Sequence, residues 1–340
     1  MKPIRVLPCA FALLLASGAP AQTINGAGAT FPYPLYGPWF DEFQSTHRGI
    51  EINYRPVGSA SGVSQLLDGA VDFGASDMPL SDEQMAEAAA KLKTTVLHFP
   101  MVLGAAVPAY NIPGLAETLK FTPEALAGMF LGSIRKWDDP AIARSNPGVK
   151  LPSNAIAVIH RAEGSGTTYC FTDYLCKVDG DWKKRVGKGT TVPWPVGTAA
   201  RSNDGVAALI KQTPYAVGYV ELTYALQNQI PFGSVRNSAG VFVRADLSGV
   251  AAAAASVAAT MPDHFRVSIT DAPGPQAYPI STFTWFLVPA KGPNAASRKA
   301  LVTFLRWALT EGQRSAAPLH YAPLPKELAA RELKALAAIQ

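Results

Sequence analysis

The sequence predicts an α/β fold with two lobes. From Ile24 onward, short apolar segments typical of strands alternate with amphipathic segments typical of helices. The 340 residues suit two domains of ordinary size, and 48% hydrophobic with 16% charged residues is typical of a globular chain. The sequence contains no long-period repeat and no low-complexity linker. We therefore expect crossing strands, rather than one flexible tether, to join the lobes.

The N-terminus predicts a cleavable secretory leader. Basic residues precede an apolar run over residues 6–16, and Ala19-Pro20-Ala21 fits a small-residue cleavage site. The run has about 11 residues, well short of the ~20 that a membrane helix needs. The alternative is an N-terminal core helix. We expect residues 1–21 to be a signal peptide and the mature, exported chain to begin near Gln22.

Each later element has its own local signal. Leu35, Trp39 and Phe43 recur every four residues and predict a helix, and Ser81 with Gln84 forms a capping box that predicts another. The remaining strands are expected at 50–54, 71–74, 98–110, 156–159, 216–220 and 280–289. The remaining helices are expected around 63–67, from Thr122-Pro123-Glu124 to 130, and at 165–177, 204–211, 297–310 and 325–339.

Charge and cysteine content exclude several classes of function. Removing Lys2 and Arg5 with the leader lowers the formal net charge from +5 to +3, and basic residues are scattered, so nucleic-acid binding is not indicated. The five histidines are isolated and no Cys/His zinc pattern exists, so no metal or cofactor is predicted.

Cys170 and Cys176 fall on different faces of one predicted helix, which favours two buried thiols over a disulfide.

Enzyme motifs are missing from the sequence. Gly26 and Gly28 lack the third glycine of a dinucleotide fingerprint, because Phe31 occupies its place. Neither a phosphate-binding loop of the GxxxxGK[ST] type nor a GxSxG elbow occurs. No nucleophile is paired with a base, so we expect a binding protein rather than an enzyme.

Three glycine-hydroxyl segments, 26–30, 58–62 and 164–168, each precede or open a predicted helix. Backbone N–H groups at helix N-termini hold anions, and small hydroxyls add donors. The hydroxyls that we expect to act as donors are those of Thr30, Ser59, Ser165 and Thr167. Each segment alone is explained as an ordinary helix cap or tight turn. Together with Arg161, which can form a bidentate charge-assisted pair, they predict a site for a small oxyanion.

Asp77, in the loop after the strand at 71–74, narrows the choice of anion. A carboxylate beside an anion is unfavourable unless the ligand carries a proton that the carboxylate accepts. Phosphate is protonated near neutral pH, whereas sulfate is not. A site of this kind therefore selects phosphate and rejects sulfate. The alternative for Asp77 is a plain helix or turn cap.

Several motifs resemble the PstS phosphate-binding proteins of bacterial ABC importers, in order from about Asn25 to Pro325. The motifs that carry the resemblance are Gly26-Ala27-Gly28-Ala29-Thr30-Phe31-Pro32, Val71-Asp72-Phe73-Gly74-Ala75-Ser76-Asp77-Met78-Pro79-Leu80-Ser81, Asn111-Ile112-Pro113-Gly114, Lys136-Trp137-Asp138-Asp139, Arg161-Ala162-Glu163-Gly164-Ser165-Gly166-Thr167, Asn203-Asp204-Gly205, Gly218-Tyr219-Val220-Glu221 and Tyr321-Ala322-Pro323-Leu324-Pro325.

The resemblance implies a set of phosphate-binding residues, contributed by both lobes: Thr30, Phe31 through its backbone N–H, Ser59, Asp77 as proton acceptor, Arg161, Ser165, Gly166 and Thr167. The chain departs from the family pattern twice. Glu163 stands where the family usually has aspartate, and Ser59-Ala60-Ser61-Gly62 stands where Ser-Ser-Gly-Gly is common. If Glu163 orients Arg161, its extra methylene alters the geometry or affinity of the site.

The resemblance further implies a type II periplasmic binding protein whose lobes close on the ligand. We expect the first lobe at 22–104 plus 278–340 and the second at 105–277, and a monomer that delivers inorganic phosphate to inner-membrane ABC permease subunits. A receptor for another oxyanion or a phosphonate, and a secreted phosphate-ester hydrolase, are the alternatives.

Overall fold

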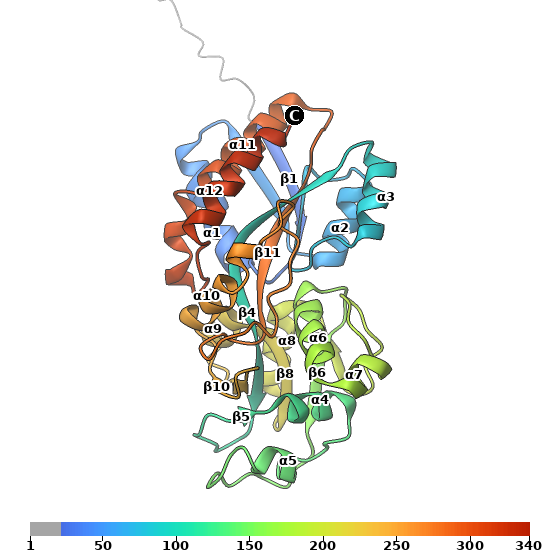
Figure 1. Cartoon of the computed structure of the whole chain (residues 1–340), viewed down its shortest axis with the longest axis vertical. Helices are drawn as coiled ribbons and strands as arrows, with labels where there is room; N and C mark the ends of the chain where they lie inside the picture. The colour runs from blue at the N-terminus through green and yellow to red at the C-terminus, as the bar shows by residue number, and fades with distance from the viewer. Residues whose placement is uncertain (1–21) are drawn as a thin grey trace, which may run out of the picture.

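The computed structural model describes residues 22–340 (Figure 1). The predicted leader over residues 1–21 lies outside the described residues. No helix within residues 22–340 has the length and apolar character that crossing a membrane requires.

One mixed sheet of eight strands runs through the molecule in the order β2-β1-β3-β11-β4-β8-β6-β7. Its strands are β1 (Gln22–Gly28), β2 (Ile50–Arg55), β3 (Phe73–Ser76), β4 (Val96–Asn111), β6 (Ala157–Arg161), β7 (Thr198–Ala200), β8 (Ala216–Glu221) and β11 (Ser281–Pro289). Parallel pairs β1–β2 and β1–β3 lie on one side of β4, and the parallel pairs β6–β7 and β6–β8 lie on the other.

The long strand β4 connects the two lobes. Its first part pairs antiparallel with β11, up to Ala105 opposite Ser281. From Ala106 onward it pairs with β8 instead, beginning opposite Glu221. Figure 1 shows β4 running from the upper lobe into the lower one. The α/β class and the two-lobed architecture predicted from the sequence are thus confirmed.

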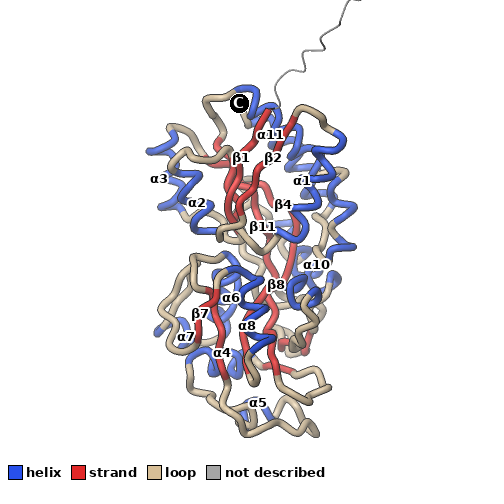
Figure 2. Tube along the Cα trace, turned by 180° about the vertical axis from the view of Figure 1, so that it is seen from behind, coloured by secondary structure: helices blue, strands red, loops and turns tan. Residues whose placement is uncertain are grey.

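Helices pack against the sheet in both lobes. The first lobe contains α1 (Tyr33–Thr46), α2 (Ser59–Leu67), α3 (Asp82–Leu92), α11 (Ala295–Ala308) and α12 (Lys326–Ala335). In both views α2 and α3 lie on one side of the first-lobe strands and α1 and α11 on the other (Figures 1 and 2). The second lobe contains α4 (Pro123–Leu131), α5 (Pro140–Ala143), α6 (Gly166–Val178), α7 (Gly180–Arg185), α8 (Ser202–Gln212), α9 (Leu222–Gln227) and a small sheet of β5 (Lys120–Phe121), β9 (Ser234–Arg236) and β10 (Phe242–Val243).

The proposed lobe boundaries at residues 104 and 278 stay a prediction. The segment that leads back to the first lobe, residues 247–285, contacts elements of both lobes. Helix α10 (Leu247–Ala255) packs against β4 and β11, and Trp285 Nε1 donates to the carbonyl of Phe265 at 2.9 Å. Thr270 Oγ1, by contrast, donates to Asp173 on α6 at 2.6 Å.

The starts of two helices agree with the local sequence signals, whereas two other element boundaries differ. The capping box is present, because Ser81 Oγ accepts from the N–H of Gln84 and Gln84 Oε1 accepts from the N–H of Ser81. Thr122 caps α4 as predicted. The strand expected at 71–74 is wrong by two residues, because pairing with β1 places β3 at Phe73–Ser76. The last predicted helix ends early, at Ala335, and continues only as a 3-10 turn.

The two thiols are free, as predicted, but their burial differs. Cys170 is buried in the core, whereas Cys176 is only partly buried, so the expectation of two buried thiols is wrong for Cys176. Six residues along α6 turn the side chain by about 600°, which puts the two cysteines on different faces of the helix.

Candidate functional site

The predicted anion-binding residues lie where strands end and helices begin. Thr30 and Phe31 connect β1 to α1, Ser59 is the first residue of α2, and Asp77 directly follows β3. Arg161 is the last residue of β6, and Ser165 caps α6 by accepting from the N–H of Thr168 at 3.2 Å. Ligands of open α/β sheets bind at the carboxyl ends of parallel strands, which is where these residues lie.

Hydrogen bonds across the two lobes bring this set together. The N–H of Gly166 donates to Ser59 Oγ at 3.0 Å, and the N–H of Ala60 donates to the carbonyl of Gly164 at 3.1 Å. Ser59 Oγ also accepts from the N–H of Asp77 at 3.3 Å. The N-termini of α2 and α6 therefore meet at the boundary between the lobes.

Glycine is required at two positions of this contact. A Cβ on Gly166 would lie 2.5 Å from both Asp77 Oδ2 and Ser59 Oγ. Gly28 has φ +147, and a Cβ there would lie 2.0 Å from the carbonyl oxygen of Ala75. Any side chain at these positions would push the strands or the lobes apart.

The guanidinium of Arg161 is buried and held in place by Glu163. Arg161 is 3% exposed, its Nε donates to Glu163 Oε1 at 3.1 Å, and its NH2 donates to the same oxygen. The N–H of Ser202 donates to this oxygen as well, at 3.0 Å. Burial raises the pKa of Glu163, but the hydrogen bonds and charge of Arg161 outweigh it and hold the pKa below its ordinary value. Despite its longer side chain, Glu163 thus contacts and orients Arg161.

Asp77 is a buried carboxyl with unused acceptor capacity. It is 1% exposed, and its Oδ1 has no hydrogen-bond partner among the described residues. Burial raises its pKa from 3.8 to about 7, although the hydroxyls of Thr284 and Ser59 and the positive charge of Arg161 each act to lower it. A carboxyl with this pKa exchanges a proton close to neutral pH.

The hydroxyls of the site are arranged as donors. Ser59 Oγ accepts two N–H bonds, as described above. Thr167 Oγ1 also accepts twice, from Arg161 NH1 at 3.4 Å and from Asn203 Nδ2 at 3.2 Å. A hydroxyl has two acceptor lone pairs and one proton. Because both lone pairs are occupied, each proton is left for a further acceptor.

Sequence reasoning missed three polar residues that support the site. Asn203 donates to Thr30 Oγ1 at 3.1 Å, and Tyr224 OH donates to the carbonyl of Thr30 at 2.5 Å. Tyr219 OH accepts from the N–H of Arg161 at 3.2 Å. Asn203 and Tyr219 stood in motifs of the resemblance without an assigned role, and Tyr224 follows the last of those motifs by three residues with no signal of its own.

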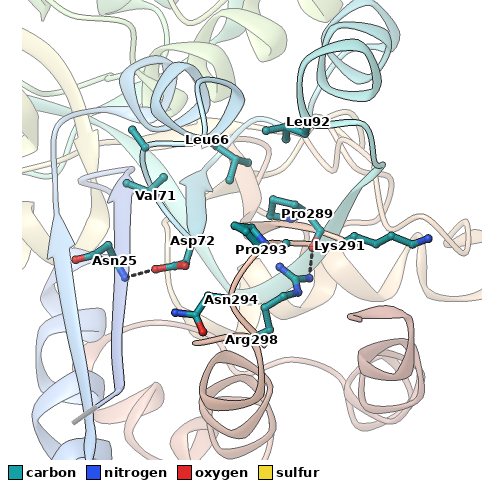
Figure 3. Close-up of a pocket in the computed structure, with 13 residues that line it drawn as sticks. Asn25, Leu66, Val71, Asp72, Leu92, Pro289, Lys291, Pro293, Asn294 and Arg298 are labelled. Carbon is teal, nitrogen blue, oxygen red and sulfur yellow. Dashed lines mark hydrogen bonds between the residues drawn. The ribbon is translucent and has the colours of Figure 1, made fainter. Parts of the chain in front are cut away.

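A separate cavity of about 490 Å³ lies in the first lobe (Figure 3). Its lining includes Asn25, Asp72 and Arg298 and none of the predicted anion-binding residues. The N–H of Asn25 donates to Asp72 Oδ2 at 2.8 Å, and Arg298 donates to the carbonyls of Pro289 and Gln340. These charged groups already serve the fold, so the cavity is not the candidate site. Residues 22–340 hold no cluster of three or more His, Cys, Asp or Glu that could hold a metal.

Comparisons with known proteins show the family and the fold of the chain. The family model of the PBP superfamily domain matches residues 16–311. Phosphate-binding protein PstS of Pasteurella multocida (strain Pm70) is 41% identical over 309 residues, covering 91% of this chain and 88% of the relative. Phosphate-binding protein PstS of Xylella fastidiosa (strain Temecula1) is 40% identical over 306 residues, covering 90% and 82%.

Solved structures show the same fold. A high affinity periplasmic phosphate-binding protein bound with phosphate superposes with a TM-score of 0.71 at 22% identity, covering 91% of this chain and 92% of that one. The phosphate binding protein of Stenotrophomonas maltophilia gives a TM-score of 0.70 at 18% identity, covering 92% and 94%.

Proposed function

This chain belongs to the PstS family of phosphate-binding proteins, and we propose that it is a high-affinity receptor for inorganic phosphate that binds the anion between its two lobes. The ligands are Thr30, the backbone N–H of Phe31, Ser59, Asp77, Arg161, Ser165, Gly166 and Thr167, with Glu163 supporting Arg161. All of these residues except Glu163 are buried.

The observation that carries the proposal is the convergence of directed donors on one buried carboxyl. The helix N-termini of α2 and α6 meet beside Asp77, and Arg161 and Thr167 approach from the second lobe. Helix N-termini and hydroxyls stabilise a phosphate oxygen through N–H and O–H donors. Asp77 Oδ1, without a protein partner among the described residues, supports the role of accepting the phosphate proton.

This proton acceptor gives the site its selectivity. A protonated phosphate donates its hydrogen to Asp77, whereas fully ionised sulfate presents only lone pairs to a carboxylate. Sulfate would therefore meet like charge without a hydrogen bond, and binding would be weakened strongly. The same argument disfavours other fully ionised oxyanions. Relatives are named as binding proteins rather than enzymes, and we propose no catalytic step.

We propose that the protein acts in the periplasm as a monomer and delivers phosphate to the permease of an ABC importer. Residues 1–21 serve as the cleaved signal peptide. The lobes, at 22–104 plus 278–340 and at 105–277, close around crossings near Gly104 and Tyr278. Phosphate favours the closed form because only that form offers it donors from both lobes.

Calorimetry on the mature chain tests the receptor function. The protein is first unfolded and refolded to remove bound ligand, then titrated with phosphate and with sulfate. One-to-one phosphate binding without sulfate heat is expected. Equal heat from both anions would indicate a general oxyanion receptor. Heat from neither would reject the proposed function.

Asp77→Asn tests the proton-acceptor role. An amide of the same shape removes the negative charge and offers sulfate an N–H donor. We expect phosphate affinity to fall by about 10-fold while sulfate binding becomes measurable, so the ratio of the two dissociation constants changes most. An equal loss of both affinities would contradict this role.

A further inference from the structure

Asn203 lies between the two lobes at the start of α8, and it is fully buried, with an exposed fraction of 0%. Its Oδ1 accepts from the N–H of Glu221 at 3.0 Å. A backbone N–H can only donate, so the atom that faces Glu221 is the amide oxygen. The amide nitrogen is thereby turned toward the candidate site.

The nitrogen contacts one hydroxyl from each lobe. Asn203 Nδ2 donates to Thr30 Oγ1 at 3.1 Å and to Thr167 Oγ1 at 3.2 Å. The amide NH₂ has two protons, and both are used. Asn203 is therefore the one described side chain that donates to both of these hydroxyls.

These bonds set the direction of the hydroxyl protons. Thr167 Oγ1 accepts from Asn203 and also from Arg161 NH1 at 3.4 Å, which leaves its proton as the only free capacity. Among the described residues, neither Thr30 Oγ1 nor Thr167 Oγ1 donates its proton to a protein acceptor. If Asn203 were a hydrogen-bond acceptor, both hydroxyls could donate to it and would be lost to an anion.

We propose that Asn203 is a positioning residue that turns the hydroxyl protons of Thr30 and Thr167 toward the bound anion and couples the two lobes through them. The inference rests on the proposed function, since it assigns Asn203 a role within the same phosphate site. Asn203 does not contact the anion; it acts through the two threonines.

The anchor of Asn203 is itself rigid. Glu221 is fully buried, and its Oε2 accepts from the N–H of Thr223 at 2.8 Å. Tyr321 OH donates to the carbonyl of Phe31 at 2.7 Å, and its oxygen lies 3.1 Å from Glu221 Oε2. The end of β8 therefore supports Asn203 and the Thr30–Phe31 loop in one hydrogen-bonded network, which fixes their relative positions.

Calorimetric phosphate titration of Asn203→Ala is the first test. We expect the dissociation constant to rise about 30-fold, because two hydroxyls that face a charged ligand lose their orientation. Asn146→Ala is the matched control. Asn146 is also buried, at 5% exposure, and its amide bonds only the backbone of Lys120 and Ile142, remote from the site. The control should lose stability but keep wild-type phosphate affinity.

A double-mutant cycle separates positioning from general stabilisation. In a background carrying Thr30→Val and Thr167→Val, the hydroxyls through which Asn203 acts are absent. Adding Asn203→Ala there should change the dissociation constant by less than about 3-fold. A loss of about 30-fold in both backgrounds would mean that Asn203 stabilises the fold without directing the hydroxyls, and would overturn the proposal.

A second variant, Asn203→Asp, covers the case in which Asn203→Ala does not fold. The carboxylate keeps an oxygen for the N–H of Glu221 but has no N–H to donate. We expect it to fold and to lose at least 30-fold in affinity, about the same as the alanine variant or more. If wild type binds phosphate and either folded variant has the same phosphate dissociation constant as wild type, only the role of Asn203 is overturned. Wild type that binds no phosphate would instead reject the proposed function.

Discussion

The buried carboxyl of Asp77 should make the stability of the ligand-free protein depend on pH. Burial raises the folded-state pKa of Asp77 from 3.8 to about 7. Between these values the folded protein binds more protons than the unfolded chain, so the free energy of unfolding falls as pH rises from about 4 to about 7. At about 1.4 kcal/mol per pKa unit, a pKa difference of about three corresponds to about 4 kcal/mol. This is an upper bound for the stability that the folded protein loses at about pH 8 by burying the ionised carboxylate of Asp77.

Urea unfolding of wild type and Asp77→Asn measures this penalty. Both proteins are stripped of ligand and kept in phosphate-free buffers, because bound phosphate would stabilise the folded state. The asparagine variant has no charge to bury. We therefore expect its stability relative to wild type to increase by several kcal/mol between about pH 4 and about pH 8.

Asp41→Asn provides the matched control, because Asp41 is an exposed carboxylate on α1. Replacing an exposed side chain of this kind should change the free energy of unfolding by no more than about 0.5 kcal/mol. A stability difference between Asp77→Asn and wild type that does not change with pH would refute the reasoning, since it would mean that Asp77 has the same pKa in the folded and unfolded states.

Two further predictions concern the lobe contact and the thiols. Gly166→Ala should raise the phosphate dissociation constant, because the added Cβ would lie 2.5 Å from Asp77 Oδ2 and Ser59 Oγ. The expected rise is at least 100-fold, about the loss of two charge-assisted hydrogen bonds, and calorimetry measures it. An affinity within about threefold of wild type would show that the lobes tolerate a methyl group there. In the native protein, a thiol reagent should label Cys176 at once and Cys170 only after unfolding, because only Cys170 is fully buried. Equal labelling rates would contradict the packing of α6.

Local sequence signals predicted the elements whose ends depend on neighbours along the chain. Ser81 and Gln84 cap the same helix and lie three residues apart, so their reciprocal bonds can be inferred from the sequence. The boundary of β3 depends instead on pairing of Phe73 with Gly26 on β1. Because that partner lies far along the chain, composition alone placed the strand two residues early.

The same distinction holds for the site. The glycine-hydroxyl segments were identified because each precedes or opens a helix, which neighbours along the chain signal, although only Ser165 caps its helix with a side chain. Asn203 was missed because its role depends on Thr30, 173 residues away, and on Thr167. Its sequence neighbourhood predicted only a helix N-terminus. The direction of its amide follows from a backbone N–H that only the folded chain brings to it.

The charges at the site explain why donor direction matters so much. Arg161, the buried cation of the candidate site, is paired with Glu163, so the pair offers an anion little net positive charge. Asp77 contributes a further negative charge when it is ionised. Attraction by net charge is therefore weak, and binding has to come from N–H and O–H dipoles aimed at the ligand. Such dipoles are effective only when each proton is correctly directed. The hydroxyls that Asn203 links lie on either side of the proposed lobe boundary. Under the closure proposed above, both protons are directed at the ligand only when the lobes are together, so closure and recognition are coupled.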